Sequence, residues 1–346
     1  MKKLLVCLLL CMFLCGCYDN ISIDRCAHPL AAGYDADENG CTVTGVYYMP
    51  TSGEAPETRT ISIHAQSPGE ARIKRNGYSF EAWSPDLLNT IVFGKSVTQS
   101  GIYPFMDMLA RAHTLSADIL LCACDGEAAD LLTPEEGGSG EELAAMLSGV
   151  LQTAGSGNLL PRTNAAEAYA AVLNGRTVLL PIIVRQDELL CTEGSLLLLG
   201  GKEAARLNAE ETLSAVMLSN SNSTGLISFV HENVKTTAQC AIICSANAEK
   251  CENGSIRFTV QLNVRAAIAE YSSQQPTRLD SAAVLASLRE QLYARTEEFY
   301  ARTHELGLDA TLLQSLAASL GANEHDAQVW KNCETVIRIE VSEKEG

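Results

Sequence analysis

The chain has 346 residues, 47% of them hydrophobic and 19% charged, which is enough to form two or three folded domains with sizeable cores. Its formal net charge of −17 argues against nucleic acid as a partner, because proteins bind nucleic acid largely through Lys and Arg on the phosphates. The lack of clustered basic residues also argues against electrostatic adhesion to anionic lipid.

The first residues, MKKLLVCLLLCMFLCGCYDN, have the three-part pattern of a bacterial export signal. Two lysines precede an uncharged apolar run from Leu4 to Cys15, and polar residues begin abruptly after Cys17. The apolar run has about a dozen residues, whereas a helix that spans a membrane needs about 20. We therefore predict that residues 1–16 are a signal peptide.

The signal ends in LCGC at residues 14–17, which resembles a bacterial lipobox. The resemblance implies cleavage before Cys17 and a diacylglycerol on its sulfur, and two acyl chains anchor a protein stably without basic residues. Cleavage would remove Lys2 and Lys3 and take the formal charge from −17 to −19. The alternative is a plain signal peptide with incidental cysteines, since three more cysteines lie in this leader.

Nine cysteines follow Cys17, an odd number that cannot all pair with one another. We interpret them as small buried hydrophobic residues, with disulfides and a metal site as the alternatives. A metal site is the weaker alternative because no CxxC pair is present. The nine are Cys26, Cys41, Cys122, Cys124, Cys191, Cys240, Cys244, Cys251 and Cys333.

The mature chain is predicted to begin with an antiparallel meander of three strands. A turn at Asp37 to Gly40 separates the first strand from the second, which covers Thr42 to Met49, and RTISIHAQ is the third. The spacing of apolar residues from Phe105 to Ala112 then predicts a helix, Ile119 to Cys124 a buried strand, and a further helix begins after Gly126.

An acidic, glycine-rich surface loop, TPEEGGSGEE, follows this region. Asn164 with Glu167 predicts the start of a helix, and RTVLLPIIV predicts a strand whose Pro181 belongs at a sheet edge or a bulge. Arg185 to Glu188 is the best linker candidate. We therefore expect an N-terminal α+β region over 17–187, with two subdomains as one option, and a C-terminal α+β domain over 188–346.

The C-terminal part is predicted to contain a strand at Leu196 to Leu199 and a helix opened by the capping box of Asn208 and Glu211. SIRFTVQLNVRAAIAEY alternates apolar and polar residues, as a half-exposed antiparallel strand does. A long helix from about Asp280 to Leu306 and a closing strand, TVIRIEV, follow. Mixed runs of strands and helices predict α+β domains with predominantly antiparallel sheets packed with helices.

The usual catalytic and cofactor motifs are incomplete in this chain. HENVK, which begins at His231, has Lys235 where a zinc protease needs its second histidine. GSLLLLGGK has the wrong glycine spacing for a phosphate loop, and Glu141 replaces the last glycine of a Gly-x-Ser-x-Gly elbow around Ser139. We therefore predict a non-enzymatic protein with no catalytic, cofactor-binding or metal-binding residue.

The order of segments resembles the Ger(x)C family, the lipoprotein C subunits of spore germinant receptors. The segments that carry the resemblance are CGCYDN with a strand ending in AAGYD, then IVFGKSVTQSGIYPFMDMLARAHTLSADILLCACDGEAADLL, then EGSLLLLGGKEAARLNAEET, and a C-terminal strand, helix, Trp330 and strand. Arg111, Lys202 and Leu207 occupy motif positions, which we interpret as packing or surface-support residues. SPGEARIKRNGYSFEAWSPDLLN departs from the pattern because it is shorter and more irregular than the expected helix.

The resemblance implies a lipid-anchored protein on the outer face of the spore's inner membrane. It would act in nutrient-triggered germination with two integral membrane partners, the A and B subunits, without a cofactor and without enzymatic activity. Cys17 alone carries over with a chemical role. The alternative is a solute-binding lipoprotein of a transporter. The sequence of such a protein would show a regular alternation of strands and helices, which is typical of parallel sheets.

Overall fold

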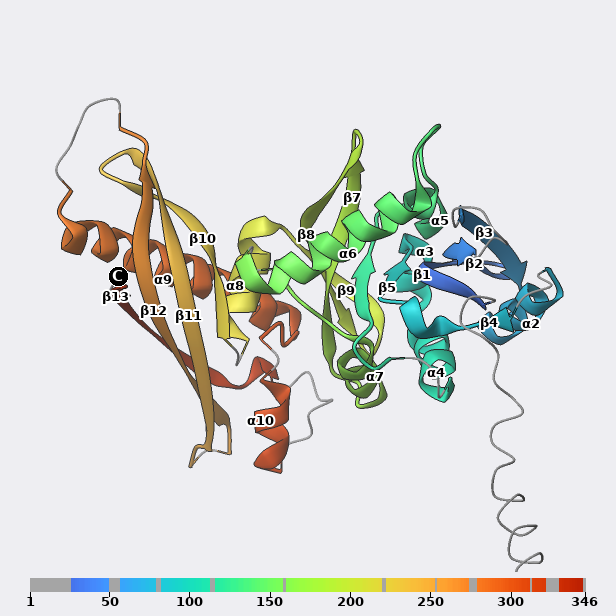
Figure 1. The fold of residues 1–346 in the computed structure, drawn as a ribbon. Helices are drawn as coiled ribbons and strands as arrows, with labels where there is room; N and C mark the ends of the chain where they lie inside the picture. The colour runs from blue at the N-terminus through green and yellow to red at the C-terminus, as the bar shows by residue number, and fades with distance from the viewer. Residues whose placement is uncertain are drawn as a thin grey trace, which may run out of the picture.

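A computed structural model provides the structure of the chain. It describes residues 26–49, 57–78, 82–112, 116–157, 160–219, 222–252, 254–273, 279–311, 313–321 and 330–344. These residues form two β-sheets that lie one after the other along the molecule, each packed with helices (Figure 1). Cys17 and the predicted signal peptide lie outside the described residues.

The first sheet has nine strands. They are β1 (Cys26–Asp37), β2 (Gly40–Met49), β3 (Glu57–Ala65), β4 (Ala82–Trp83), β5 (Thr90–Phe93), β6 (Leu120–Ala123), β7 (Thr177–Gln186), β8 (Leu189–Leu199) and β9 (Lys202–Leu207). Their order is β3-β2-β1-β5-β6-β7-β8-β9, with β4 paired to β1. The predicted meander is confirmed by the antiparallel β1, β2 and β3, whereas β1, β5, β6 and β7 are parallel neighbours.

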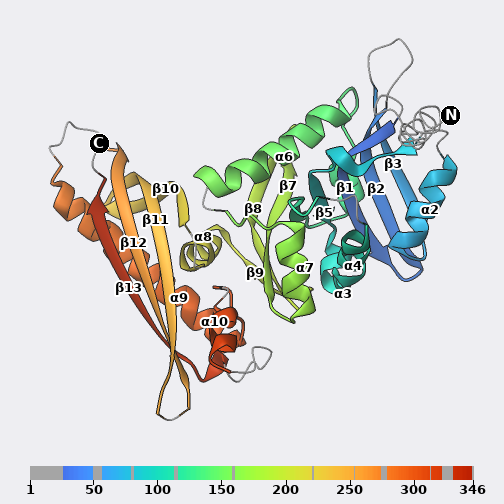
Figure 2. The same ribbon diagram turned by 60° about the horizontal axis from the view of Figure 1, so that its bottom comes forward.

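Helices cover both faces of the first sheet. They are α2 (Pro68–Tyr78), η2 (Pro85–Leu87), α3 (Lys95–Ser100), α4 (Tyr103–Arg111), α5 (Ala128–Leu132), α6 (Gly140–Gly157) and α7 (Ala165–Leu173). One core packs α3, α4 and α7 against the sheet, and a second core packs α5 and α6 against the opposite face. Figure 2 shows α6 on one side of the sheet and α7 on the other. Burial on both faces explains why every residue of the central strands β5 and β6 is buried and all but Thr90 are apolar.

The second sheet has four strands in the order β10-β11-β12-β13. The elements of this half are α8 (Ala209–Leu218), β10 (Asn222–His231), β11 (Val234–Lys250), β12 (Ile256–Tyr271), α9 (Ser281–Leu306), α10 (Gln314–Ser319) and β13 (Glu334–Glu343). The predicted alternation is confirmed in β12, whose apolar residues are buried in a core with α9. The long helix begins after its N-cap Asp280 and ends at Gly307, which has a left-handed backbone with φ 69°.

The two sheets meet through α8, which lies between them in both views (Figures 1 and 2). The core of the second sheet includes Leu179, Leu197 and Leu207 from the first. A buried hydrogen bond also crosses the junction, since Thr177 Oγ1 donates to the Asp309 carbonyl oxygen at 2.6 Å. The two halves of the chain therefore share one hydrophobic core where α8 lies between the sheets.

The α+β class with predominantly antiparallel pairing is confirmed, but two local predictions differ from the structure. Arg185 to Glu188, expected to be a linker, includes a hairpin turn in which Asp187 has φ 53°, because β7 pairs directly with β8. The division at 187 and 188 passes through this hairpin, and the change from one sheet to the other comes later, over α8. The glycine-rich loop ends earlier than expected, because α6 begins at Gly140.

Pro181 lies in β7, which is an inner strand, and the pairing with β8 shifts register between Pro181 and Ile183. Of the two places predicted for this proline, the bulge is therefore the one observed. Seven of the nine described cysteines are buried, as the interpretation as small core residues predicts, whereas Cys191 and Cys251 are partly exposed. Among the described helices, none combines the length and apolar character needed to cross a membrane.

Candidate functional site at the carboxyl ends of the parallel strands

The carboxyl ends of β1, β5 and β6 meet at one edge of the first sheet. Because these strands are parallel neighbours, the residues that follow them come together although they are far apart in the sequence. In open sheets with parallel strands, this edge is where ligands usually bind. Asp35, Gly94 and Asp125 lie at or near these three strand ends, which makes this edge the candidate functional site.

Asp35 is buried, with 7% of its surface exposed, and its carboxylate fastens the start of α5. The backbone N–H groups of Ala128 and Ala129 donate to its two oxygens at 2.7 and 3.0 Å. Burial raises the pKa of Asp35 above its usual range, and the two N–H groups partly oppose this effect. Gly94 is required beside this carboxylate, because a Cβ there would lie 1.9 Å from Asp35 Oδ1.

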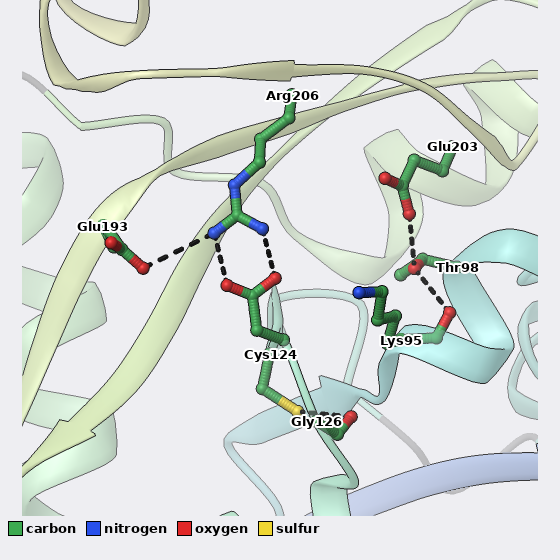
Figure 3. Close-up of polar contacts among 8 residues, drawn as sticks. Lys95, Thr98, Cys124, Gly126, Glu193, Glu203 and Arg206 are labelled. Atoms are coloured by element: carbon green, nitrogen blue, oxygen red, sulfur yellow. Dashed lines mark hydrogen bonds and ion pairs between the residues drawn. The ribbon is translucent and has the colours of Figure 1, made fainter.

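Cys124 lies next to this carboxylate, but its thiol is unsuited to nucleophilic chemistry. Burial, followed by the negative charge of Asp35, raises the pKa of Cys124 to about 12. The thiol donates to the Gly126 carbonyl oxygen at 3.5 Å (Figure 3). Because the thiolate is the reactive form, Cys124 at neutral pH is a protonated core residue.

An ion-pair cluster connects the end of β6 to β8 and β9. Arg206 of β9 donates from two guanidinium nitrogens to the carboxylate of Asp125, and its Nη2 also lies 3.4 Å from Glu193 Oε2 (Figure 3). Hydrogen bonding to Arg206 lowers the pKa of Asp125. Arg302 of α9 donates to the Arg206 carbonyl oxygen at 3.4 Å, so the cluster extends to the C-terminal half.

A second contact joins α3 to β9 at the same edge. Thr98 Oγ1 lies 3.2 Å from Glu203 Oε2 and 3.0 Å from the Lys95 carbonyl oxygen (Figure 3). The Ile102 N–H donates to the Gly201 carbonyl oxygen at 3.0 Å, which fixes the end of α3 on the turn before β9. Two segments about 100 residues apart in the sequence are thereby held together.

The two carboxylates at this edge take part in contacts between elements of the fold. The carboxylates of Asp35 and Asp125 are engaged by backbone N–H groups and by Arg206. Within the described ranges, no cluster of three or more His, Cys, Asp or Glu residues could hold a metal ion. The arrangement fastens strand ends to one another and to α5, α3 and α9.

A family model described as the spore germination protein N-terminal domain matches residues 19–185. The N-terminal half of the chain therefore resembles spore germination proteins, in agreement with the predicted resemblance to the Ger(x)C family. No curated protein matches the chain. Among solved structures, one described as the crystal structure of the GerBC protein has a TM-score of 0.61 and 14% sequence identity, and the match covers 94% of this chain and 100% of that chain. The two proteins therefore share a fold.

The Ger(x)C segments recognised in the sequence meet at the edge described above. IVFGKSVTQSGIYP contributes Thr98 and Ile102, and EGSLLLLGGKEAARLN contributes Gly201 and Glu203, so both contacts between α3 and the β9 region join the two segments. The two segments therefore have a joint structural role at this edge. Sequence reasoning missed Asp35 and Arg206, although Gly94 directly after β5 and Asp125 shortly after β6 were signals of a strand end with functional potential.

The Ger(x)C motif residues have the structural positions expected of packing and support residues. Leu207 is 1% exposed in the core that joins the sheets, and Arg111 is an exposed partner of Asp107 at 2.8 Å. Lys202 is exposed, and its Cγ would lie 3.3 Å from a Cβ at Gly101, whose φ is 123°. The role of Cys17 stays a prediction, because this residue lies outside the described residues.

Proposed function

We propose that this chain is the lipid-anchored C subunit of a nutrient germinant receptor. In this proposal a diacylglycerol on Cys17 holds the body on the outer face of the spore's inner membrane, where it works with the integral membrane A and B subunits. The observation that carries the proposal is the spore germination domain over residues 19–185, which begins two residues after Cys17. The fold shared with GerBC over 94% of the chain supports it.

A lipid anchor suits the charge of this protein. The formal charge of −17 disfavours adhesion to an anionic bilayer, so attachment has to come from buried hydrocarbon. One acyl chain holds a protein only marginally and two hold it stably, at about 0.8 kcal/mol per buried methylene group. A diacyl group on Cys17 therefore supplies the attachment without help from basic residues.

The chemistry of the described residues supports a role without catalysis. The thiol of Cys124 keeps its proton, and the carboxylates beside it are used in hydrogen bonds and ion pairs. In this proposal the subunit acts by binding to the integral membrane subunits of the receptor. An extended body of two joined sheets offers the membrane subunits a large and stiff surface (Figure 1).

Fatty-acid labelling tests the anchor. We expect labelled palmitate to be incorporated into the wild-type chain and lost from a Cys17→Ala variant, because the sulfur of Cys17 is the acceptor. Cys15→Ala is the matched control, since it removes a leader cysteine and should retain the label. Label retained on Cys17→Ala, or a mature amino terminus at any other residue, would overturn the anchor.

Purification from spore membranes tests the assembly. The tagged chain at native expression should co-purify from detergent extracts with the A and B subunits encoded beside it. Cys17→Ala should reduce recovery by releasing the body from the membrane. A wild-type chain recovered free of both subunits would count against the receptor role, and an ATPase encoded beside it would favour the solute-binding alternative.

A further inference from the structure

A cavity of 270 Å³ lies in the N-terminal part of the chain, apart from the edge that holds Asp35 and Arg206. Its floor is the face of β1, β2 and β3, and its walls are α2 and α4, with the segment from Trp83 to Leu88 along the rim. Most of the lining is apolar, from residues such as Ala32, Val43 and Ile63. The contacts between the Ger(x)C segments described above do not account for this cavity.

Arg75 of α2 is the positive charge at one end of the cavity. Its Cζ lies 4.7 Å from the ring centroid of Trp83, a cation–π contact, and Tyr47 packs against the same ring with centroids 4.6 Å apart. Arg75 also hydrogen-bonds the Tyr47 hydroxyl and lowers its pKa against the larger effect of burial. Tyr34 lines the cavity too, and burial raises its pKa, so its hydroxyl keeps its proton.

Two N–H groups of this cluster have no acceptor within the part of the chain that the structure describes. Arg75 Nε and Trp83 Nε1 are buried and lack a hydrogen-bond partner among the described residues. In that same part of the chain, no carboxylate forms an ion pair with Arg72 or Arg75. Leaving a buried donor unpaired is unfavourable because its hydrogen bond to water is lost, and it is more unfavourable for a charged group. An anion bound beside Arg75 would remove that cost.

The lining is unusual for such an acidic protein. The chain has 42 acidic and 25 basic residues, yet the described lining has two arginines and one acid, Asp86. Asp86 is already engaged, because its carboxylate accepts from the Ser84 hydroxyl. The polar end of the cavity therefore presents donors and positive charge, while the remainder presents apolar surface.

We propose that this cavity binds a small organic carboxylate, with the carboxylate group on Arg75 and Trp83 and an apolar body against the β1-β2-β3 face. An apolar cavity of about 150 Å³ accommodates benzene, so 270 Å³ holds a somewhat larger molecule. Guanidinium is the side chain best matched to a carboxylate. The proposal does not depend on the receptor role, because binding is a property of the chain alone.

Calorimetry and tryptophan fluorescence on the purified full chain test it. The probes are phenylacetate and hydrocinnamate, each compared with its neutral amide of nearly the same shape. The chain has two tryptophans, so a Trp330→Phe background leaves Trp83 in the cavity as the reporter. We expect at least one carboxylate to change Trp83 emission and to bind at least about tenfold tighter than its amide.

Arg75→Gln should lower carboxylate affinity by about tenfold and leave amide affinity nearly unchanged, since the charged contact with the ligand is lost while the apolar lining is kept. Arg59→Gln is the matched control, because Arg59 is an exposed arginine of β3 that pairs with Glu57 and should affect neither ligand. The comparison of acid with amide on the unaltered cavity needs no variant, so poor folding of Arg75→Gln would not block the test. Equal affinity for acid and amide, or no binding of either acid up to about 10 mM, would overturn the proposal.

Discussion

The Asp35 carboxylate occupies the space that a side chain at Gly94 would need, since a Cβ there would lie 1.9 Å from Asp35 Oδ1. Gly94 has φ −66° and ψ 162°, a conformation open to any residue, so the restriction comes from the neighbour and not from the backbone. The same carboxylate accepts from Ala128 and Ala129. One contact thus couples the ends of β1 and β5 to the start of α5.

Gly94→Ala should lower the free energy of unfolding by about 1–3 kcal/mol, because the methyl group must displace a buried carboxylate and its two N–H donors. Urea denaturation measures the change. Gly126→Ala is the matched control, since a Cβ at Gly126 meets no atom within 4 Å and its effect should stay within about 0.5 kcal/mol. Equal effects of the two substitutions would contradict the role assigned to Asp35.

The ionisation of Asp35 should make a measurable contribution to the pH dependence of the free energy of unfolding. Its pKa is raised in the folded state, chiefly by burial, so the folded chain holds this proton more tightly than the unfolded chain. The stabilising contribution is therefore full below the unfolded value of 3.8 and is lost as the pH rises through the folded-state pKa. Ionised Asp35 is the less favourable form of a buried carboxyl.

Asp35→Asn removes this titration and so isolates it from other acids. We expect the difference in unfolding free energy, wild type minus Asp35→Asn, to decrease as the pH rises from about 4 to about 7. Asp125 titrates in the opposite sense, because Arg206 lowers its pKa, but it is present in both proteins and cancels. A difference that stays flat or increases with pH would show that Asp35 is not held as described.

The elements predicted well from the sequence were those specified by neighbouring residues. Asn208 and Glu211 form the reciprocal capping box, and Asp280 and Gly307 bound the long helix, because caps act within one turn. The alternation in β12 marks its buried face for the same local reason. The helix α6 was overlooked, although Leu143, Leu147 and Leu151 repeat at helical spacing and are buried.

The contacts of Asp35, Asp125 and Arg206 at the edge of the first sheet could not be predicted from the sequence, because the partners are distant in the chain. Arg206 pairs with Asp125, 81 residues away, and Ala128 with Asp35, 93 residues away. Both contacts depend on the parallel order of β1, β5 and β6, which no local pattern specifies. The hairpin after β7 resembles a linker in the sequence, because a few polar residues between two apolar runs are typical of both.

Burial predicts which of the nine described cysteines react in the native chain. Cys191 and Cys251 are partly exposed, and the other seven are buried. Burial also raises the pKa of Cys124 and Cys240 to about 12, so at pH 8 only about one thiol in ten thousand would be ionised. Iodoacetamide should therefore label Cys191 and Cys251 first, as read by peptide mass spectrometry.

Labelling in denaturant provides the control, since all nine thiols should then react at similar rates. The distinguishing measurement is the ratio of native to denatured labelling at each cysteine. Cys124 modified as fast as Cys191 in the native chain would mean that the edge of the first sheet opens to solvent or that the thiol is activated. Either result would reopen the interpretation of Cys124 as an inert core residue.

A double-mutant cycle on Asp125 and Arg206 should give a small coupling energy. The side chains are 39% and 42% exposed, so solvent screens the pair, and exposed pairs with good geometry contribute about 0.2–1 kcal/mol. Asp125→Asn, Arg206→Gln and the double variant, each unfolded in urea, give the coupling. Arg206 also lies 3.4 Å from Glu193, so Arg206→Gln alone should cost more than Asp125→Asn.

Salt separates this electrostatic coupling from a packing effect. Raising the ionic strength from about 0.1 to about 1 M shortens the screening length from about 10 to about 3 Å, so the coupling should fall toward zero. The Arg257 and Glu334 pair of the second sheet, at 2.8 Å and similarly exposed, is the matched control and should respond to salt in the same way. A coupling between Asp125 and Arg206 that persists in high salt would indicate that the fork of hydrogen bonds is shielded from solvent and stabilises the strand ends more strongly than an exposed pair can.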